Sequence, residues 1–386
     1  MNTHSVWVVL ALLLVICRSP VEAANFNKPK AITTVNPFAT FVDVEGANPR
    51  LCIPRDGRVI ALRGYKYPDK DYKSFTTNRE RTTMNLIRSM WAVINQNLDP
   101  TKRDREKFQQ WMTKFVTAIN SGYYSKINNS ERVDAKYRFA DGKSGPDPSY
   151  GAKIALLNAA YLVSIVDSLG YWEPGQRQSV IAWGNNLYPQ TLKDRRGRPL
   201  SKQSKDNVAL RAAAYIAWGA VSGTQEPVDY AKKSYISALE PIGNDGAYLH
   251  WLKKADTAWK VDQAFREDDK TVGLLVLAAH IAKKTGTDFY SLKNDDGMEL
   301  KDAIAWLLKA HFSPAETAES ELLKDQLRIG AGLDVSHWSW TPIYFNDFPK
   351  DELANQLMEK SDIYRPSNGY HHRESMGPVS CLFDRR

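Results

Sequence analysis

The chain has 386 residues, of which 43% are hydrophobic and 25% are charged, and its net charge at pH 7 is +8. No Walker loop, HExxH, CxxC or GxSxG motif occurs, so nothing in the sequence supports a nucleotide site, a structural zinc site or a nucleophile elbow. The basic residues are scattered, apart from KDRRGRP at 193–199, and most are expected to form a solvated surface.

The chain begins with an apolar run from Val6 to Cys17, and small residues follow as far as Ala23. This pattern is typical of a signal peptide and is too short for a membrane span. We expect cleavage after Ala23 and a single mature domain, 24–386, in the periplasm or outside the cell, without membrane insertion. A lipoprotein anchor at Cys17 is the alternative, which the bulky Ile16 disfavours.

Two cysteines, Cys52 and Cys381, remain in the mature chain. In an oxidising compartment two thiols more often pair than stay free, so we expect a bridge between the start and the end of the fold. Exported proteins seldom meet nucleic acid, so the positive charge favours an acidic glycan as partner. We expect a monomer.

Helical periodicity dominates the mature chain, and no run of alternating strand residues is seen. Turns rich in Gly, Pro, Asp and Asn separate the helical segments, whose spacing predicts antiparallel helix pairs in a ring or solenoid. The aromatic side chains are expected mainly in the core, and the rest could line a sugar-binding groove. The predicted helices are 78–96, 105–122, 149–170, 174–192, 209–221, 227–242, 270–286 and 298–314.

The segment SKQSKDNVALRAAAYIAWGAV, 201–221, opens polar and continues as a helix. Ser204 and Asp206 have the side-chain oxygens that cap helix starts. Asn207 and Arg211 are four residues apart and share one helix face, which we expect at an exposed helix end. They form either ordinary surface or the floor of a site that holds an anion.

Five segments in order resemble polysaccharide lyase family 5, the periplasmic alginate lyases. They are YKSFTTNRERTTMN (72–85), SYGAKIALLNAAYL (149–162), DNVALRAAAYIAWGAV (206–221), NDGAYLHWLKKADTAW (244–259), and the C-terminal stretch from HWSWTPIYFNDFP to RPSNGYHHRESMGPVSCLF. The resemblance implies an all-α (α/α) toroid, an incomplete ring of antiparallel helix pairs around a central groove. It also implies cleavage of a uronate polymer by β-elimination without a cofactor.

The same resemblance exposes a departure at the expected catalytic centre. The family's Asn-Asn-His falls on Asp206, Asn207 and Val208, and valine cannot accept a proton. The family's tyrosine is also missing from the corresponding stretch, AWKVDQAFREDD (258–269). The chain is therefore either a lyase with a rebuilt site or a lyase fold that binds without cleaving.

In a rebuilt site, Arg211 replaces a tryptophan of the family and lies about 6 Å along the helix from Asn207. The two side chains could grip one uronate carboxylate. His250 and Tyr248 are candidate bases, as are three tyrosines of the lid-like segment, and a structural role for His250 is the alternative. Tyr215 lies too deep and is expected in the core. The lid-like tyrosines are Tyr65, Tyr67 and Tyr72.

The lid-like segment also supplies Lys73 and Arg81, which match the family's lysine and arginine. With Tyr67, Tyr72 and Arg266 they are the predicted substrate-binding residues.

Two other functions stay open. The chain could bind an acidic exopolysaccharide without cleaving it. It could also be a toroidal hydrolase, for which REDD at 266–269 supplies carboxylates, although such a charged run more often marks a solvated turn.

Overall fold

A computed structural model describes residues 40–45, 47, 90, 91, 93–121, 148–192, 200, 203–248, 250, 258–312, 340–363 and 382; at 148–150, 258–266, 311, 312 and 360–363 it describes the helix backbone only. All of these residues belong to one compact unit, Val35–Arg386. The predicted signal peptide lies outside the described residues, and so do Cys52 and Cys381.

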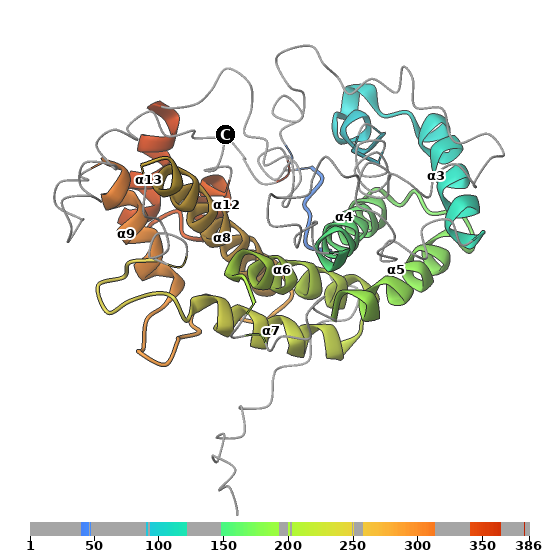
Figure 1. Cartoon of the computed structure of the whole chain (residues 1–386). Helices are drawn as coiled ribbons and strands as arrows, with labels where there is room; N and C mark the ends of the chain where they lie inside the picture. The colour runs from blue at the N-terminus through green and yellow to red at the C-terminus, as the bar shows by residue number, and fades with distance from the viewer. Residues whose placement is uncertain are drawn as a thin grey trace, which may run out of the picture. The chain divides into compact units, whose positions relative to one another are not determined.

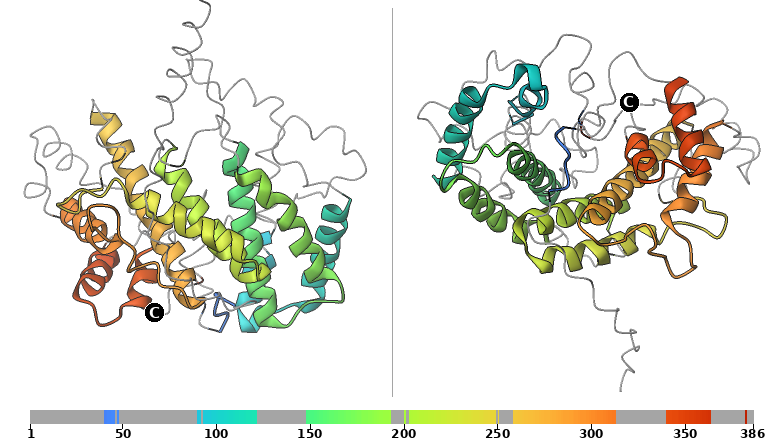
Figure 2. Two further views of the ribbon diagram at one scale, coloured as in Figure 1. Left: turned by 90° about the horizontal axis from the view of Figure 1, so that it is seen from below. Right: turned by 180° about the vertical axis from the view of Figure 1, so that it is seen from behind.

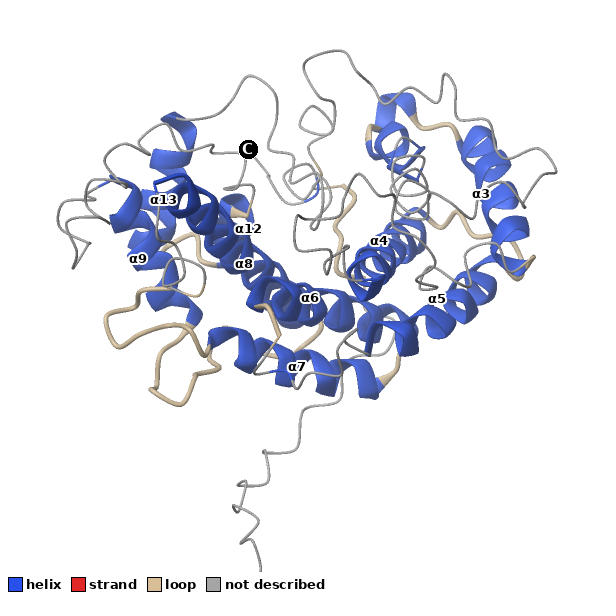
Figure 3. Ribbon diagram, viewed as in Figure 1, coloured by secondary structure: helices blue, strands red, loops and turns tan. Residues whose placement is uncertain are grey.

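The described part of the chain consists of helices and loops and contains no strand, which confirms the prediction of an all-α fold (Figure 3). Two isolated bridges, Ile242 with Tyr248 and Lys293 with Glu299, close short loops. The helices are η3 (Pro100–Lys102), α3 (Arg105–Asn120), α4 (Pro148–Leu169), α5 (Gln176–Leu192), α6 (Lys205–Ser222), α7 (Gln225–Leu239), α8 (Ala258–Lys284), α9 (Leu300–Phe312), α12 (Thr341–Asp347) and α13 (Glu352–Ile363).

Neighbouring helices pack in a continuous series. Helix α3 contacts α5, α5 contacts α4, and α4 contacts α6; α6 then packs on both α7 and α8 (Figure 1). Helix α8 in turn contacts α9 and α12, and α12 contacts α13. In the further views α4, α6 and α8 lie side by side in that order (Figure 2). Helix α6 therefore lies in the middle of this series and packs against α4, α7 and α8.

Helix α6 is apolar on nearly every side, which is the pattern of a fully buried helix. From Val208 to Val221 every residue is buried, including Trp218. At the C-terminal end Gly223 adopts φ +69°, and its N–H donates to the carbonyl of Gly219 at 3.0 Å. This left-handed position favours glycine and ends the helix, so that the chain turns directly into α7.

The start of α6 differs in one respect from the capping expected from the sequence. Ser204 is the N-cap residue, but its side chain makes no capping hydrogen bond to the backbone. Its hydroxyl donates instead to Oδ1 of Asp206, within the first turn. The carboxylate of Asp206 still lies where the partial positive charge of a helix N-terminus stabilises it.

Helix α4 is the most apolar of the described helices. Its segment Gly151–Leu169 is long and apolar enough to span a membrane. Most of this segment is buried inside the structure, as in the core helix of a globular protein. Two polar side chains interrupt this apolar surface, Lys153 and Asn158, and both are buried. Asn158 accepts a hydrogen bond from the indole of Trp91 at 2.6 Å, which ties the segment before α3 to α4.

Helix α8 begins at Ala258, twelve residues before the predicted start at residue 270. The run REDD at 266–269 is part of this helix, so the expectation of a solvated turn is wrong. Asp268 and Asp269 are both buried, and burial raises the pKa of Asp269 well above its ordinary value. Helices α12 and α13 were not predicted from the sequence.

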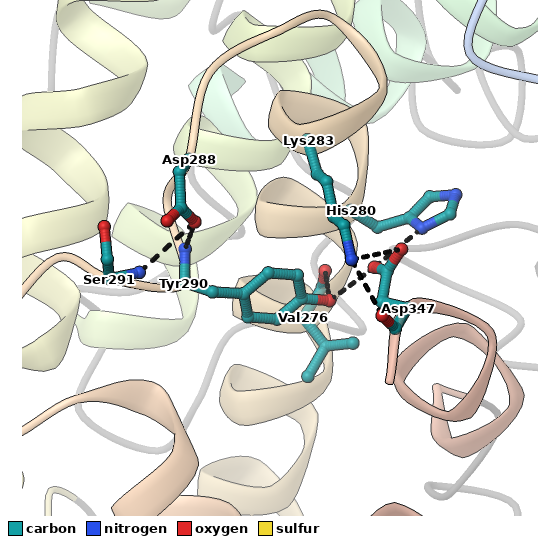
Figure 4. Close-up of polar contacts among 7 residues, drawn as sticks. All are labelled: Val276, His280, Lys283, Asp288, Tyr290, Ser291 and Asp347. Carbon is teal, nitrogen blue, oxygen red and sulfur yellow. Dashed lines mark hydrogen bonds and ion pairs between the residues drawn. The ribbon is translucent and has the colours of Figure 1, made fainter. Parts of the chain in front are cut away.

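A buried carboxylate joins the end of α12 to α8 (Figure 4). Oδ2 of Asp347 accepts the hydroxyl of Tyr290 at 2.8 Å and lies 2.9 Å from Nδ1 of His280. The ammonium of Lys283 donates to the backbone carbonyl of Asp347 at 2.7 Å. Three side chains from α8 and the loop after it thus hold one residue of α12.

Candidate functional site

Charged side chains from several elements meet at the N-terminal end of α6. Lys205 donates to the carbonyl of Ser237 at 2.7 Å and pairs with Glu240 at 2.6 Å, which fixes the first residue of α6 to the end of α7. From α8, Lys270 lies 3.7 Å from Asp206 and also pairs with Glu267. The site is therefore built where α4, α6, α7 and α8 converge.

Asn207 is half-buried in the first turn of α6, and a side chain of α4 contacts it. Nζ of Lys153 donates to Oδ1 of Asn207. Lys153 has no exposed surface at all, so this ammonium is held in the interior of the protein. The contact places a positive charge beside the residue that the family resemblance marks as a site residue.

Arg211 does not lie at an exposed helix end, which corrects the expectation from the sequence. It is only 4% exposed, and its Nη2 donates to Oε1 of Gln203 at 2.9 Å. Gln203 precedes α6, so the guanidinium extends toward the N-terminal end of the helix, the direction in which helical side chains lean. Its Nε is buried without a hydrogen-bond partner. Among the described residues, no carboxylate forms an ion pair with Arg211.

Tyr215 lies one turn further along α6 and is fully buried, as the sequence predicted. Its hydroxyl is 2.5 Å from that of Thr191 on α5. Burial raises the pKa of Tyr215 to about 12, although the charge of Arg211 and the hydrogen bond with Thr191 oppose the rise. A phenol with such a pKa stays protonated at neutral pH and serves the core.

Tyr248 occupies a core position and not an open site. It is fully buried, and its hydroxyl donates to the carbonyl of Ala238 at 2.9 Å. Burial raises the pKa of Tyr248 well above the ordinary value, and the charges of Asp268, Asp206 and Glu240 raise it further. A phenol that holds its proton this firmly is a poor base, so we do not retain Tyr248 as a catalytic candidate.

The loop that carries Tyr248 also carries His250. Because Tyr248 donates to the carbonyl of Ala238, this loop packs against the end of α7, which Lys205 of α6 also contacts. A tight turn shapes it: Gly246 has φ +82°, and a Cβ there would lie 2.8 Å from the carbonyl oxygen of Asp302. His250 follows at a half-buried position. It is the remaining candidate base among the described residues.

Val208, at the position where the family resemblance expects a histidine, is fully buried in the hydrophobic core. It can neither hold nor accept a proton. Arg266 lies on the backbone of α8, but its side chain is outside the described residues. The other predicted residues lie wholly outside them: the substrate-binding candidates Tyr67, Tyr72, Lys73 and Arg81, the alternative base Tyr65, and the cysteines Cys52 and Cys381.

Sequence reasoning missed Lys153. A signal for it was present, because Lys153 is a lone cation in the apolar run GAKIALLNAAYLV, where a lysine is not expected unless it is paired. Its partner lies 54 positions away on another helix, so no local pattern could identify the contact. Within the described residues, no group of three or more His, Cys, Asp or Glu is placed to hold a metal ion.

Solved structures share this arrangement of helices. A histidine-to-alanine variant and a tyrosine-to-phenylalanine variant of alginate lyase A1-III, both complexed with tetrasaccharide, each match at a TM-score of 0.58 and 15% identity. Alginate lyase A1-III from Sphingomonas species A1 matches at 0.56 and 15% identity. Each match covers 92% of this chain and 97% of the other chain. The chain is thus an (α/α) toroid.

The family match agrees with this fold. Residues 139–317 match the family model described as Alginate lyase. This region contains α4 to α9, and with them Lys153, Asn207 and Arg211. No curated protein matches the chain. With the shared fold, the family match makes this chain similar to alginate lyases and supports polysaccharide lyase activity.

Proposed function

We propose that this protein is an exported polysaccharide lyase that cleaves an anionic, uronate-containing polysaccharide by β-elimination. The periplasm or the cell exterior is its proposed location, on the basis of the apolar run at the start of the chain. It acts as a monomer and needs no cofactor. The observation that carries the proposal is the group of Lys153, Asn207 and Arg211 within the region that matches the alginate lyase family.

The reaction sets three chemical demands. A base removes the proton from C5 of the uronate, the C4–O bond breaks, and a double bond forms between C4 and C5 while the leaving oxygen gains a proton. The carboxylate next to C5 must be neutralised, because negative charge develops on it as the proton leaves. In our proposal Asn207 and Arg211 neutralise that carboxylate, and His250 is the candidate base.

In our proposal the sugar units further from the cleaved bond are bound by side chains of the lid-like segment and of α8. We propose that Lys73 and Arg81 bind further carboxylates, that Tyr67 and Tyr72 contact sugar rings, and that Arg266 contributes from α8. Binding through such charges weakens as salt screens them. Lys73→Ala and added salt should therefore each weaken the binding of acidic oligosaccharides, as measured by calorimetry.

A panel of polysaccharides tests the proposed activity. The panel contains several uronate polymers and, as controls, neutral polysaccharides. Incubation with the protein should produce the ultraviolet absorbance of an unsaturated uronate with at least one uronate polymer and with none of the neutral ones. Asn207→Ala should abolish most of this signal, whereas the matched control Asn186→Ala, at an exposed position of α5, should not.

The second candidate function is binding without cleavage. The observation that favours it is Val208, a buried apolar residue where the family resemblance expects the catalytic histidine. Binding of an acidic polysaccharide with no unsaturated product from any member of the panel would favour this function over a lyase. Neither binding nor product with any uronate polymer would contradict both.

A further inference from the structure

We propose that Lys153 is a positioning residue that fixes the side-chain amide of Asn207 and makes the site selective for an ionised carboxylate. This inference rests on the proposed function and adds to it a residue and a substrate preference. The residue is a buried lysine of α4, and the amide that it contacts lies in the first turn of α6. The cation that contacts Asn207 is thus Lys153 of α4, whereas the sequence suggested Arg211 of α6.

The direction of the contact follows from the chemistry of the two groups. A lysine ammonium has three donors and no acceptor, so it can bond only to the amide oxygen and not to the NH2 group. Oδ1 of Asn207 accordingly faces Lys153. The two N–H donors then point away from the ammonium, which is the orientation in which an asparagine can donate to a carboxylate.

The contact with Lys153 favours one of the two orientations of the amide. The two ends of an asparagine side chain differ little in size, so only its hydrogen-bond partners decide which end faces a ligand. A carboxylate accepts and cannot donate, and the amide oxygen would repel it. One orientation of Asn207 therefore binds the uronate carboxylate, and Lys153 holds that orientation before the substrate arrives.

The buried charge has a second effect. Because Lys153 is fully buried, water screens its field less than it screens that of a surface lysine. The helix N-terminus beside it adds partial positive charge of the same sign. Both favour a negatively charged group over a neutral one, so the site should prefer an ionised uronate to its methyl ester.

The other cations at this end of α6 are placed differently. Lys205 and Lys270 are paired with carboxylates, through Glu240 in the first case and through Glu267 and Asp206 in the second. Lys153 contacts the amide of a proposed site residue. The positioning role is assigned to Lys153 because of this direct contact with Asn207.

Two variants test the assignment. Lys153→Met keeps the length and the apolar stem but removes the ammonium, and Lys153→Gln keeps a donor for Oδ1 without the charge. Lys309→Met, at an exposed position of α9, is the matched control. The first readout needs no ligand: it is the NMR signal of the Asn207 side-chain amide, assigned by its loss in Asn207→Ala. This signal should shift in Lys153→Met, shift less in Lys153→Gln and stay unchanged in Lys309→Met.

The second readout is kcat/KM on an ionised uronate oligosaccharide and on its methyl ester. Lys153→Met should lower the value for the ionised substrate at least tenfold and the value for the ester much less. Lys153→Met combined with Asn207→Ala should lose little more than Asn207→Ala alone, because both changes remove the same contact. Lys153→Gln should recover part of the loss.

Three results would overturn the assignment: an unshifted Asn207 amide in Lys153→Met, equal losses on both substrates, or fully additive losses in the double variant. A change in melting temperature alone would point to a purely structural lysine. The wild-type protein separates this inference from the proposed function. If the wild-type protein neither binds nor cleaves any uronate polymer, the proposed function is wrong. The NMR signal of the Asn207 amide still shows whether Lys153 orients that amide.

Discussion

The indole ring of Trp218 on α6 lies directly against Gly184 on α5, so closely that a Cβ added at Gly184 would come 2.1 Å from the ring. Trp218 is fully buried, and its indole N–H donates to Oδ1 of Asn185 at 3.0 Å. The ring is therefore held in place on two sides. Glycine is required here by the close approach of two helices and not by the backbone conformation.

Gly184→Ala should consequently destabilise the protein. The added methyl group cannot be accommodated without moving Trp218, and overpacking of this kind costs about 1–3 kcal/mol. Gly151→Ala in α4 is the matched control, since no atom lies within 4 Å of its added Cβ. Urea unfolding should show a lower free energy of unfolding for the first variant and an unchanged or higher one for the second. Equal stability of the two variants would contradict the packing described.

A second prediction concerns the guanidinium that joins three helices. Arg177 on α5 makes two hydrogen bonds to Asp167 of α4, at 2.9 and 3.0 Å, and a third to the carbonyl of Val221 of α6 at 3.0 Å. A lysine cannot reproduce this planar arrangement. Arg177→Lys should lower the free energy of unfolding by about 1–3 kcal/mol, and Arg105→Lys, on the exposed start of α3, should not. A loss of similar size in both variants would argue against the three-helix contact.

Acid should weaken the contact between α8 and α12. Burial raises the pKa of Asp347, but the hydrogen bonds from His280 and Tyr290 and the charge of Lys283 outweigh it and keep this pKa below its ordinary value. A carboxyl whose pKa is lowered in the folded state stabilises the protein above the unfolded value of about 3.9, and this contribution is lost as the pH falls through the folded pKa.

Asp347→Asn should therefore lower the stability at pH 7 by about 2 kcal/mol, the typical value of hydrogen bonds to a charged group. It should also flatten the fall in stability below about pH 4, since the variant has no carboxyl to protonate there. The control is Asp295→Asn, at an exposed loop position. Melting temperatures from pH 2 to pH 7 measure both effects, and parallel curves for the wild type and Asp347→Asn would contradict the assignment.

The predicted disulfide bridge between Cys52 and Cys381 can be tested by counting free thiols. Closing so long a loop stabilises by about 4–5 kcal/mol in the chain-entropy model. Thiol labelling of the denatured, unreduced mature protein should find no free cysteine, and reduction should lower the melting temperature. Two labelled thiols before reduction would show that the bridge is absent.

Periodicity in the sequence located the helices where the apolar pattern was regular. Helices α3, α4 and α5 begin and end within a few residues of the predictions. It failed for α8, because REDD has the composition of a solvated turn, whereas tertiary packing buries Asp268 and Asp269. It also failed for α12, which is only seven residues long.

The site was partly predictable. Asn207 followed from the family resemblance, and its place in the first turn of α6 is confirmed. The exposure of Arg211 was predicted wrongly, because the burial of one side chain depends on which helices surround it. Lys153 was missed for the same reason, since its contact with Asn207 depends on the packing of α4 on α6.

The central position of α6 has a consequence for how the protein opens. A helix covered by α4, α7 and α8 cannot expose its amides by local fraying, so its amide hydrogens should exchange with solvent only when the whole domain unfolds. Among the described helices, α3 packs mainly on α5 and α13 mainly on α12, so both should exchange sooner. Asn207 therefore lies on a helix that is expected to open late among those described. If the proposed function holds, the first turn of α6 offers the uronate carboxylate a fixed position.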